Sequence, residues 1–319
     1  MRESKRVLAV VLALLVAAAV LVGCGGASES GGSAQDNSNK TLTLGNIGWT
    51  ENVAVANLTK VVLEEDLGYQ EVELQTLDVG LLFEGVASGD LHAFQDVWMP
   101  NHTQLLAEVE GDVEHLEPWY EGETTFGLAV PSYMEGVNSI ADLNGSGAET
   151  IVGIEPGAVI SEKVEDNVIP DYNLTLEHEP SSTAAMLAEV ERLYNDQEPF
   201  VFPPWCPHPM CGEVSGWHGQ PTNDLGGMYD FRYLEDPENS LGNLDEPAKI
   251  SAIVNADLPD DDPVAYAFIN NLRLNEEDLI SLETEISNAG DDAVEGTQAW
   301  LEENRDVVQP AIDAAKQAQ

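Results

Sequence analysis

The stretch TLTLGNIGWTENVAVANLTKVVLEE, residues 41–65, predicts the first strand and the first helix of this chain. Polar and apolar residues alternate over residues 41–47, which indicates a strand with one buried face. Over residues 51–65 apolar side chains such as Leu58, Val61 and Val62 recur at helical spacing, which indicates a helix with one buried face. A strand that leads directly into a helix is the unit from which α/β folds are built.

The alternation of strands and helices continues through the rest of the chain. Further strands are predicted at residues 72–77, 92–97, 126–130, 151–154, 199–203 and 250–254, and further helices at residues 81–88, 183–194, 263–274, 275–287 and 292–317. This order predicts an α/β fold with largely parallel sheets. In such sheets ligands bind beyond the carboxyl ends of the strands.

Three tryptophans lie at the ends of predicted strands, each in a short polar motif. The motifs are Gly48-Trp49-Thr50-Glu51-Asn52, Trp98-Met99-Pro100-Asn101 and Trp205-Cys206-Pro207-His208. A single tryptophan would more often be a core residue, and we expect Trp119, Trp217 and Trp300 to pack inside the protein or lie on its surface. Three indole faces that converge on one cleft would instead bind a cation that cannot donate hydrogen bonds, such as a quaternary ammonium.

The N-terminus predicts export. Residues 1–23 carry three basic side chains and then an apolar run, residues 7–22, that is too short for a transmembrane helix. The signal ends in Leu21-Val22-Gly23-Cys24, which resembles the bacterial lipobox, so we expect cleavage before Cys24 and lipidation of that cysteine. Residues 24–40 are then a flexible linker. The alternative is an uncleaved signal anchor; in both cases the body lies outside the cytoplasm and is attached to the cell membrane.

The chain is strongly acidic. It has 12 Lys and Arg against 58 Asp and Glu, a formal net charge of −46, and removing residues 1–23 leaves nine basic against 57 acidic side chains. Such a surface argues against nucleic acid and anionic lipid as partners, because both are polyanions. Concentrated salt shortens the Debye length to about 3 Å and so screens the repulsion. The charge therefore favours a halophilic source over an ordinary acidic secreted protein.

Besides Cys24, the chain has two cysteines, Cys206 and Cys211. Exported proteins form disulfides, so a Cys206–Cys211 bond is one expectation. The same segment contains His208, with His218 beyond it, and is also compatible with a metal site; two free thiols are the third possibility. An exported zinc-dependent hydrolase could be built on these cysteines and histidines, although the sequence has neither a His-Glu-x-x-His nor a Gly-x-Ser-x-Gly motif.

Motifs along nearly the whole body resemble those of the substrate-binding lipoproteins of ABC importers for glycine betaine, proline betaine and choline. Besides the tryptophan motifs, the resemblance is carried by Leu67-Gly68-Tyr69, Gly127-Leu128-Ala129-Val130-Pro131-Ser132-Tyr133, Ser139-Ile140-Ala141-Asp142-Leu143, Gly153-Ile154-Glu155-Pro156-Gly157, Ser181-Ser182-Thr183-Ala184-Ala185-Met186 and Tyr233-Leu234-Glu235-Asp236-Pro237. It implies a two-lobed α/β fold like that of type II periplasmic binding proteins, with the ligand cleft between the lobes. The first lobe is then expected at residues 41–131, the second at 132–248, and a return to the first at 249–319.

The resemblance also implies what the protein does. It implies a binding protein without catalytic residues, cofactor or metal, which captures a quaternary ammonium solute and delivers it to an ABC importer permease. Trp49 and Trp98 would belong to the first lobe and Trp205 to the second, so that closure of the lobes brings the three rings together. A ligand sensor that docks on a membrane receptor would have the same fold.

The other end of a betaine is a carboxylate, and no Lys or Arg lies in the tryptophan motifs or in the Pro156-Gly157 turn. Successive backbone N–H groups at a turn entering a helix also bind anions. By the resemblance, the N–H groups of Val159 and Ile160 are the candidates. The resemblance also implies a histidine after the second tryptophan motif; here His102 and Thr103 are in transposed order, so either of them is a candidate.

Choline is the alternative ligand within the same family. It carries a hydroxyl in place of the carboxylate, and Glu51, two residues after Trp49, is a possible partner of its cation. Choline-binding relatives resemble one another in having Asn and Asp after the Pro-Gly turn, where this chain has Ala158 and Val159, so betaine is favoured. Residues 211–229 are an apparent insertion relative to the family pattern, expected to form a surface loop near the mouth of the cleft.

Overall fold

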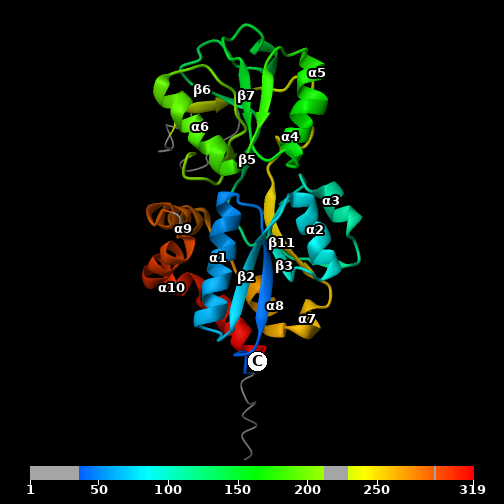
Figure 1. Cartoon of the computed structure of the whole chain (residues 1–319), viewed down its shortest axis with the longest axis vertical. Coiled ribbons are helices and arrows are strands. Elements are labelled where there is room, and N and C mark those ends of the chain that lie inside the picture. Colours follow the sequence, from blue (N-terminus) through cyan, green and yellow to red (C-terminus); the bar gives the residue numbers. More distant parts are fainter. Residues whose placement is uncertain (1–35, 212–228, 291) are drawn as a thin grey trace, which may run out of the picture. The chain divides into compact units, whose positions relative to one another are not determined.

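A five-stranded mixed sheet forms the centre of the first lobe (Figure 1). The computed structural model describes residues 36–211, 229–290 and 292–319. The strand order is β2-β1-β3-β11-β4: β1 (Thr41–Asn46) lies parallel to β2 (Glu71–Thr76) and to β3 (Ala93–Met99), and β11 (Lys249–Asn255) runs antiparallel between β3 and β4 (Val113–His115). The β1/β3 neighbours are the point at which the chain order reverses, where open α/β sheets bind their ligands.

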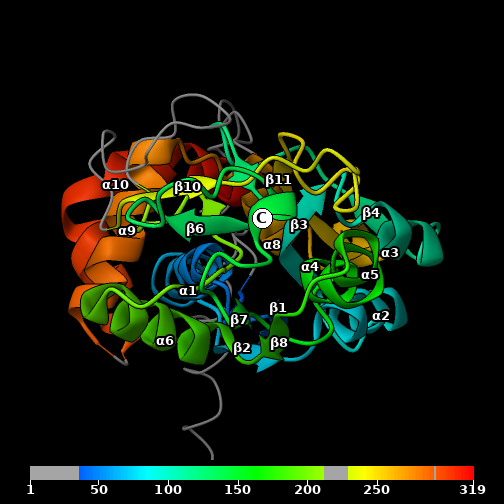
Figure 2. The same ribbon diagram turned by 90° about the horizontal axis from the view of Figure 1, so that it is seen from above.

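Helices cover both faces of this sheet. The first-lobe helices are α1 (Thr50–Glu65), α2 (Val79–Ser88), α3 (Thr103–Glu108), α7 (Leu258–Asp261), α8 (Pro263–Asn271), α9 (Glu276–Asn288) and α10 (Ala293–Gln317). Helix α1 packs on the sheet and is backed by α9 and α10, whereas α2 packs on β1, β3 and β11 from the other side. Seen from above, α9 and α10 lie on one flank and α2 and α3 on the other (Figure 2).

In the part of the second lobe that the structure describes, short strand pairs are combined with three α-helices. Strand β7 (Thr150–Gly153) is parallel to β8 (Glu177–Pro180), while β5 (Thr125–Phe126) pairs antiparallel with β9 (Trp205–Cys206), and β6 (Ala129–Pro131) with β10 (Phe231–Tyr233). A short 3₁₀ turn occupies Ile140–Asp142. Helix α4 (Val159–Lys163) continues through a π-helical segment, Val164–Val168, into α5 (Ile169–Tyr172), and α6 is Thr183–Asp196.

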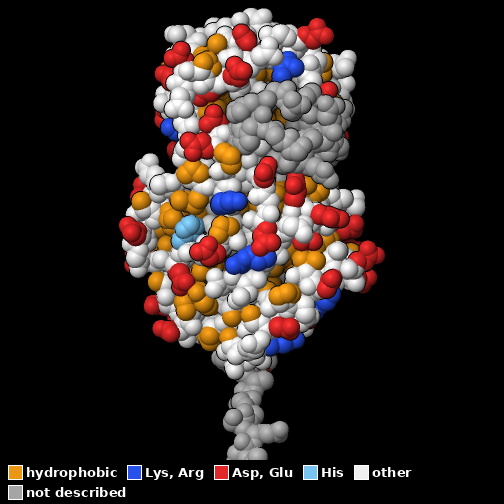
Figure 3. Space-filling model, turned by 180° about the vertical axis from the view of Figure 1, so that it is seen from behind, with side chains coloured by type: hydrophobic (Ala, Val, Ile, Leu, Met, Phe, Trp, Pro, Cys, Tyr) orange, Lys and Arg blue, Asp and Glu red, His pale blue; other side chains and the backbone are white. Residues whose placement is uncertain are grey.

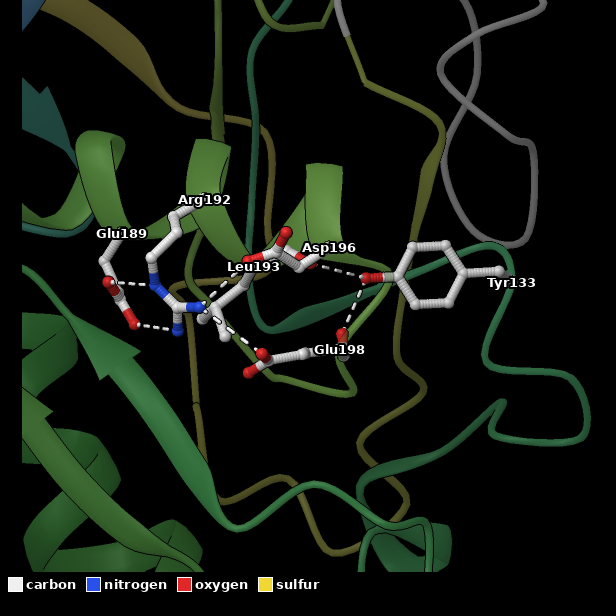
Figure 4. A network of polar contacts seen from close by, with 6 residues as sticks. All are labelled: Tyr133, Glu189, Arg192, Leu193, Asp196 and Glu198. Atoms are coloured by element: carbon white, nitrogen blue, oxygen red, sulfur yellow. Dashed lines mark hydrogen bonds and ion pairs between the residues drawn. The ribbon is translucent and has the colours of Figure 1, made fainter.

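Polar contacts fix both ends of α6, and Figure 4 shows those near its last turn. The side chain of Ser182 caps its first turn. Near its last turn, the guanidinium of Arg192 donates to both carboxylate oxygens of Glu189, at 2.8 and 3.0 Å. The hydroxyl of Tyr133 donates to the backbone oxygen of Glu198 at 2.6 Å. These contacts hold α6 against the segment that follows β6.

The two lobes are joined where the chain passes between them near Thr124 and again near Ala248. The hydroxyl of Thr124 donates to the backbone oxygen of Ala248 at 3.0 Å and accepts the N–H of the same residue at 2.6 Å. Both Thr124 and Ala248 are buried. The two crossing segments are therefore bonded to each other at the boundary between the lobes.

Acidic side chains are spread over both lobes. On the face drawn in Figure 3, Asp and Glu side chains occur over the whole surface with few Lys and Arg among them. This distribution agrees with the formal net charge of −46. Among the described residues, no helix is long and apolar enough to cross a membrane.

The two-lobed α/β architecture is confirmed, but three details of the prediction were wrong. The sheets are mixed rather than largely parallel, because β11 enters the first-lobe sheet antiparallel to β3. The strand predicted at 126–130 is two short strands, β5 and β6, which pair with β9 and β10; the strands within residues 125–131 therefore pair with strands of the second lobe, although they were expected in the first. The strand predicted at 199–203 makes only isolated bridges, at Val201 and Phe202, since the prolines that follow have no N–H to donate.

Several predictions concern residues outside the part of the chain that the structure describes. These are the signal at 1–23, the lipidation of Cys24, most of the linker at 24–40, and nearly all of the insertion at 211–229 with Trp217 and His218. Trp119 and Trp300, which were expected to pack or lie at the surface, are both buried at 2% exposure.

Candidate ligand-binding site

All three motif tryptophans line one hollow between the lobes, whose empty volume, with the space open to solvent included, is about 410 Å³. The first lobe contributes residues from β3, the start of α1 and the start of α3; the second contributes β5, β9, and the turn into α4. The lining residues are Trp49, Glu51, Trp98, Asn101, His102, Phe126, Ile154, Ala158, Val159, Ile160, Trp205 and Leu244.

Local backbone geometry places each ring. Gly48 has a φ of 93°, a conformation that favours glycine, and it turns the chain from β1 so that Trp49 becomes the N-cap residue of α1. Trp98 is the next-to-last residue of β3, and Trp205 opens β9, paired with Phe126 of β5. The first two rings therefore stand at the carboxyl ends of the neighbouring parallel strands β1 and β3, where a ligand is expected.

A carboxylate accepts the indole N–H of each of these tryptophans. The donor–acceptor distances are 3.1 Å from Trp49 Nε1 to Glu155 Oε2, 2.9 Å from Trp98 Nε1 to Asp96 Oδ1, and 2.9 Å from Trp205 Nε1 to Glu51 Oε2. These bonds use the edge of each ring and leave its π-face free. Each ring is thereby held in one orientation by a hydrogen bond to a carboxyl group.

Three buried carboxyl groups, those of Glu51, Asp96 and Glu283, affect one another's ionisation. Burial raises the pKa of Glu51 to about 7, opposed by the hydrogen bonds that its carboxylate accepts. Burial, and then the charge of Glu51, raise the pKa of Asp96 and of Glu283 well above the usual range. Since each ionised member makes the next harder to ionise, this trio carries less than its full negative charge near neutral pH.

The start of helix α4 also lines the hollow. Helix α4 begins at Val159 without a side-chain cap, and Val159 and Ile160 supply its first two N–H groups, which precede any acceptor within the helix. Both residues line the hollow, and no Lys or Arg is among the described residues that line it. An anion at this position would be bound by helix N–H groups rather than by a cationic side chain.

His102 lies in the hollow and Thr103 does not. The Nδ1 atom of His102 accepts the backbone N–H of Trp98 at 3.2 Å, and the ring stacks on Trp49 with 6.0 Å between centroids. Burial lowers the pKa of His102 to about 4, so near neutral pH the ring is neutral and carries its proton on Nε2. Thr103 is exposed, and its hydroxyl donates to the backbone oxygen of Pro100 at 2.5 Å. Of the two candidates, the structure brings only His102 to the tryptophans.

Sequence reasoning missed a fourth aromatic ring. Phe126 lines the hollow, and its ring lies 6.3 Å from that of Trp98 at an interplanar angle of 48°. The sequence predicts it only as the first residue of the strand at 126–130, because no polar motif surrounds it. Asn101 and Leu244 also line the hollow; Asn101 stood in a quoted motif, whereas nothing near Leu244 distinguished it from a core residue.

Cys206 and Cys211 form a disulfide. Their thiols are therefore not available as zinc ligands. His208 is buried outside the hollow, with its ring edge-on to that of Trp205 and its Nδ1 accepting the N–H of Met210 at 3.0 Å. No group of three or more His, Cys, Asp or Glu that could hold a metal ion occurs within residues 36–211, 229–290 and 292–319.

The comparisons with known proteins agree with this geometry. The family model of OpuAC, the substrate-binding domain of the ABC-type glycine betaine transport system, matches residues 40–303. The chain belongs to this family. Members are extracytoplasmic binding proteins of transport systems rather than enzymes, so the zinc hydrolase considered from the sequence has no support.

Individual relatives support the same assignment of this OpuAC-family chain. A glycine betaine/carnitine transport binding protein from Listeria monocytogenes serotype 1/2a (strain 10403S) is 31% identical over 170 residues, 52% of this chain and 50% of the relative; the matched region thus spans about half the length of that relative. The lactococcal OpuAC, solved closed with glycine betaine, is 27% identical with a TM-score of 0.71, over 86% of this chain and all of that one. An ABC-transporter choline-binding protein solved with choline shares the fold at 23% identity and a TM-score of 0.72, over 87% of this chain and 96% of that one.

Proposed function

We propose that this protein captures glycine betaine or proline betaine outside the cytoplasm and delivers it to an ABC importer permease. The observation that carries the proposal is one hollow lined by four aromatic rings and by the two residues whose N–H groups begin α4 without a side-chain cap, and we assign the cation end of the ligand to the rings and its anionic end to the N–H groups. The glycine betaine bound to the lactococcal OpuAC and the ligands named for the Listeria relative support the same ligand class. A zwitterion with a bulky cation matches both ends.

The cation end requires faces rather than hydrogen-bond acceptors. A trimethylammonium group has no N–H, so a carboxylate attracts it without orienting it. We propose that Trp49, Trp98, Trp205 and Phe126 surround it, each contributing about 0.5 to 2 kcal/mol. Four such contacts supply a large part of the about 8 kcal/mol that corresponds to a micromolar Kd. In this arrangement Glu51 acts on the cation through its charge, since its carboxylate already accepts the indole N–H of Trp205.

The carboxylate end requires donors. We propose that the N–H groups of Val159 and Ile160 bind the ligand carboxylate, with His102 Nε2 as a third donor. The ring of His102 is held by its bond from Trp98, which leaves Nε2 as the atom that can donate. Helix N-termini favour anions through their free N–H groups and their dipole, so this end needs no basic side chain.

Choline remains the second candidate, because the buried carboxyl of Glu51 would favour any quaternary ammonium. Its hydroxyl, however, would leave the N–H groups of Val159 and Ile160 facing a weaker acceptor than a carboxylate. A buried donor without a good partner costs about 1 to 3 kcal/mol. We therefore expect betaine to bind more tightly than choline.

We further propose that the chain is a lipoprotein, cleaved before Cys24 and attached to the cell membrane by a lipid on that residue. The proposal includes a flexible linker up to residue 40, a lobe boundary near Thr124 and Ala248, and no enzymatic activity. The excess of acidic over basic side chains supports a halophilic source and predicts that binding and folding are best measured in concentrated salt.

Titration calorimetry at high salt tests the ligand. The panel is glycine betaine, proline betaine, choline, carnitine and ectoine. We expect glycine betaine or proline betaine to bind with a Kd in the micromolar range and choline at least several-fold more weakly. If nothing in the panel binds more tightly than about millimolar, which is roughly 4 kcal/mol, the aromatic-cage function is wrong. If choline binds more tightly than either betaine, choline is the ligand of the site.

A further inference from the structure

Glu155 of the second lobe holds Trp49 of the first. Its Oε2 atom accepts the indole N–H of Trp49 at 3.1 Å and the hydroxyl of Thr183 at 3.0 Å, and its Oε1 accepts the backbone N–H of Thr183 at 2.7 Å. Two bonds from Thr183, at the start of α6, thus fix the carboxylate on the second lobe. Its Oε2 atom accepts hydrogen bonds from both Thr183 and Trp49. Glu155 itself is not among the residues that line the cage.

A second bond runs in the opposite direction. Trp205, from the second lobe, donates its indole N–H to Glu51 of the first lobe at 2.9 Å. Trp98 differs from both, since its partner Asp96 lies two residues away on the same strand. Two of the three cage tryptophans are therefore oriented by a carboxylate of the opposite lobe.

We propose that Glu155 is a positioning residue that fixes Trp49 only when the lobes are closed, and so slows the release of the ligand. The proposal rests on the proposed function, because it needs a ligand that Trp49 contacts. A carboxylate accepting an N–H is among the stronger protein hydrogen bonds, and its partners here lie on different lobes, so opening the cleft breaks it. The orientation of the Trp49 ring is thereby coupled to lobe closure. Related complexes differ mostly in dissociation rate, which is the quantity this bond controls.

The alternative is that Glu155 only supports α6. Its two bonds to Thr183 lie within the second lobe and do not involve Trp49. A purely structural role would therefore give the same effect whether or not residue 49 can donate a hydrogen bond. Trp49→Phe keeps an aromatic face in the cage and removes the N–H, so it separates the two roles.

The experiment measures the ligand dissociation rate by stopped flow in Glu155→Ala and Glu155→Gln, each with Trp49 and with Trp49→Phe. Glycine betaine is the ligand. Glu155→Ala should speed dissociation about tenfold in the Trp49 protein and less than about twofold in the Trp49→Phe protein. Glu155→Gln keeps one acceptor oxygen but turns its NH2 toward a donor that the carboxylate now accepts, so it should give a rate between those of the Glu155 protein and Glu155→Ala. Glu177→Ala is the control, because it removes the same charge from an exposed position at the start of β8 and should leave the rate unchanged.

A ligand-independent readout keeps the test valid if no betaine binds. Dyes attached at the exposed positions Glu149 of the second lobe and Ser287 of the first report the distance between the lobes. Glu155→Ala and Trp49→Phe should each shift the population toward larger distances, and the double variant should go no further than either alone. Equal effects of Glu155→Ala in both residue-49 backgrounds, or no effect on rate and distance, would overturn the proposal. Absence of betaine binding with the distance shifts present would overturn the proposed function alone.

Discussion

The indole N–H of Trp205 donates to the buried carboxyl of Glu51 at 2.9 Å, although 154 positions separate the two residues in the sequence. This bond makes an acidic side chain part of an aromatic cage. Glu51 is only 1% exposed, and Asp96 and Glu283 lie close enough to be affected by its charge. A cation bound in the proposed site would therefore meet an electrostatic field that depends on the protonation of these groups.

Binding of a quaternary ammonium ligand should strengthen as the pH rises from 6 to 8. Burial raises the pKa of Glu51 from an ordinary value of about 4.5 to about 7, so below pH 7 the carboxyl is mostly neutral. The ligand cation favours the ionised form, so binding should release protons and tighten several-fold over this interval. Calorimetry in two buffers of different ionisation enthalpy measures the release. Glu51→Gln should flatten the pH profile; an unchanged slope would assign it to another group. The pKa of His102, about 4, keeps that ring neutral throughout.

The same carboxyl should affect stability in the absence of ligand, with the opposite sign. Its pKa is higher in the folded than in the unfolded chain, so the folded state binds the proton more tightly. The free energy of unfolding should then fall as the pH rises from about 4.5 to about 7. Urea unfolding at a series of pH values measures this fall, and Glu51→Gln should remove part of it. The rest of the fall should persist in this variant, because the pKa values of Asp96 and Glu283 are also raised.

Removing any one of the three cage indoles should weaken binding. Trp49→Ala, Trp98→Ala and Trp205→Ala should each raise the Kd for betaine at least several-fold, since one cation–π contact contributes about 0.5 to 2 kcal/mol. Trp300→Phe is the control, because Trp300 is buried in α10, where it donates to Ser281 at 2.8 Å. That change should lower stability and leave the Kd unaltered. A cage variant with wild-type affinity would remove its residue from the site.

Phe126→Leu tests the fourth ring. Leucine keeps an apolar side chain at this position and removes the π-face, so packing is largely preserved. The Kd for glycine betaine should rise about two- to fivefold, as expected for one exposed-type cation–π contact. Phe126→Tyr should bind as the natural protein does. If the Kd of Phe126→Leu equals that of the natural protein, the residue contributes only apolar contact to the site.

His102→Phe separates the two ends of the ligand. Phenylalanine retains a flat ring beside Trp49 and has no N–H to donate. Because a hydrogen bond to a charged group contributes about 1.5 to 3 kcal/mol, betaine binding should weaken tenfold or more. Choline, which has no carboxylate, should lose much less. The two Kd values, measured side by side by calorimetry, give the ratio; equal losses would indicate that His102 acts on the cation end or on the fold.

Reduction of the Cys206–Cys211 disulfide should loosen the segment that carries Trp205. The bond closes a short loop, for which chain entropy predicts about 2 kcal/mol of stabilisation. A Cys206→Ser, Cys211→Ser double variant should therefore unfold at lower urea concentration and bind betaine more weakly. Elemental analysis of the reduced protein for zinc provides a second measurement. One zinc ion per chain would contradict the assignment of these cysteines to a disulfide alone.

Much of the site could be predicted from short motifs, because its tryptophans stand at strand ends. The alternation in residues 41–47 and the helical spacing after it predicted β1, α1 and the turn between them, and with them the place of Trp49. His102 and Thr103 could not be told apart, since the decision depends on how α3 begins. There the hydroxyl of Thr103 bonds to Pro100 and turns away from the hollow.

The carboxylates that orient the rings were less accessible to prediction. Glu155 lies in a quoted motif, yet its bond to Trp49 joins residues 106 positions apart, and no local pattern encodes a contact across the cleft. The prediction of strand direction was wrong for the same reason, because pairing between distant segments leaves no local pattern. An apolar run such as residues 250–254 predicts a buried strand, but its antiparallel pairing with β3 depends on where the chain returns from the second lobe.

The pairing of Val97 with Ser251 also sets an order for folding during synthesis. These partners are 154 positions apart, and all strands and helices of the second lobe lie between them in the sequence. While the chain emerges from its N-terminus, β3 has an open edge until residues 249–255 appear, and open edges are prone to pairing with other chains. The second lobe can be complete before the first one is, so the earliest folded body in a nascent chain should be the middle of the sequence, from β5 to β10.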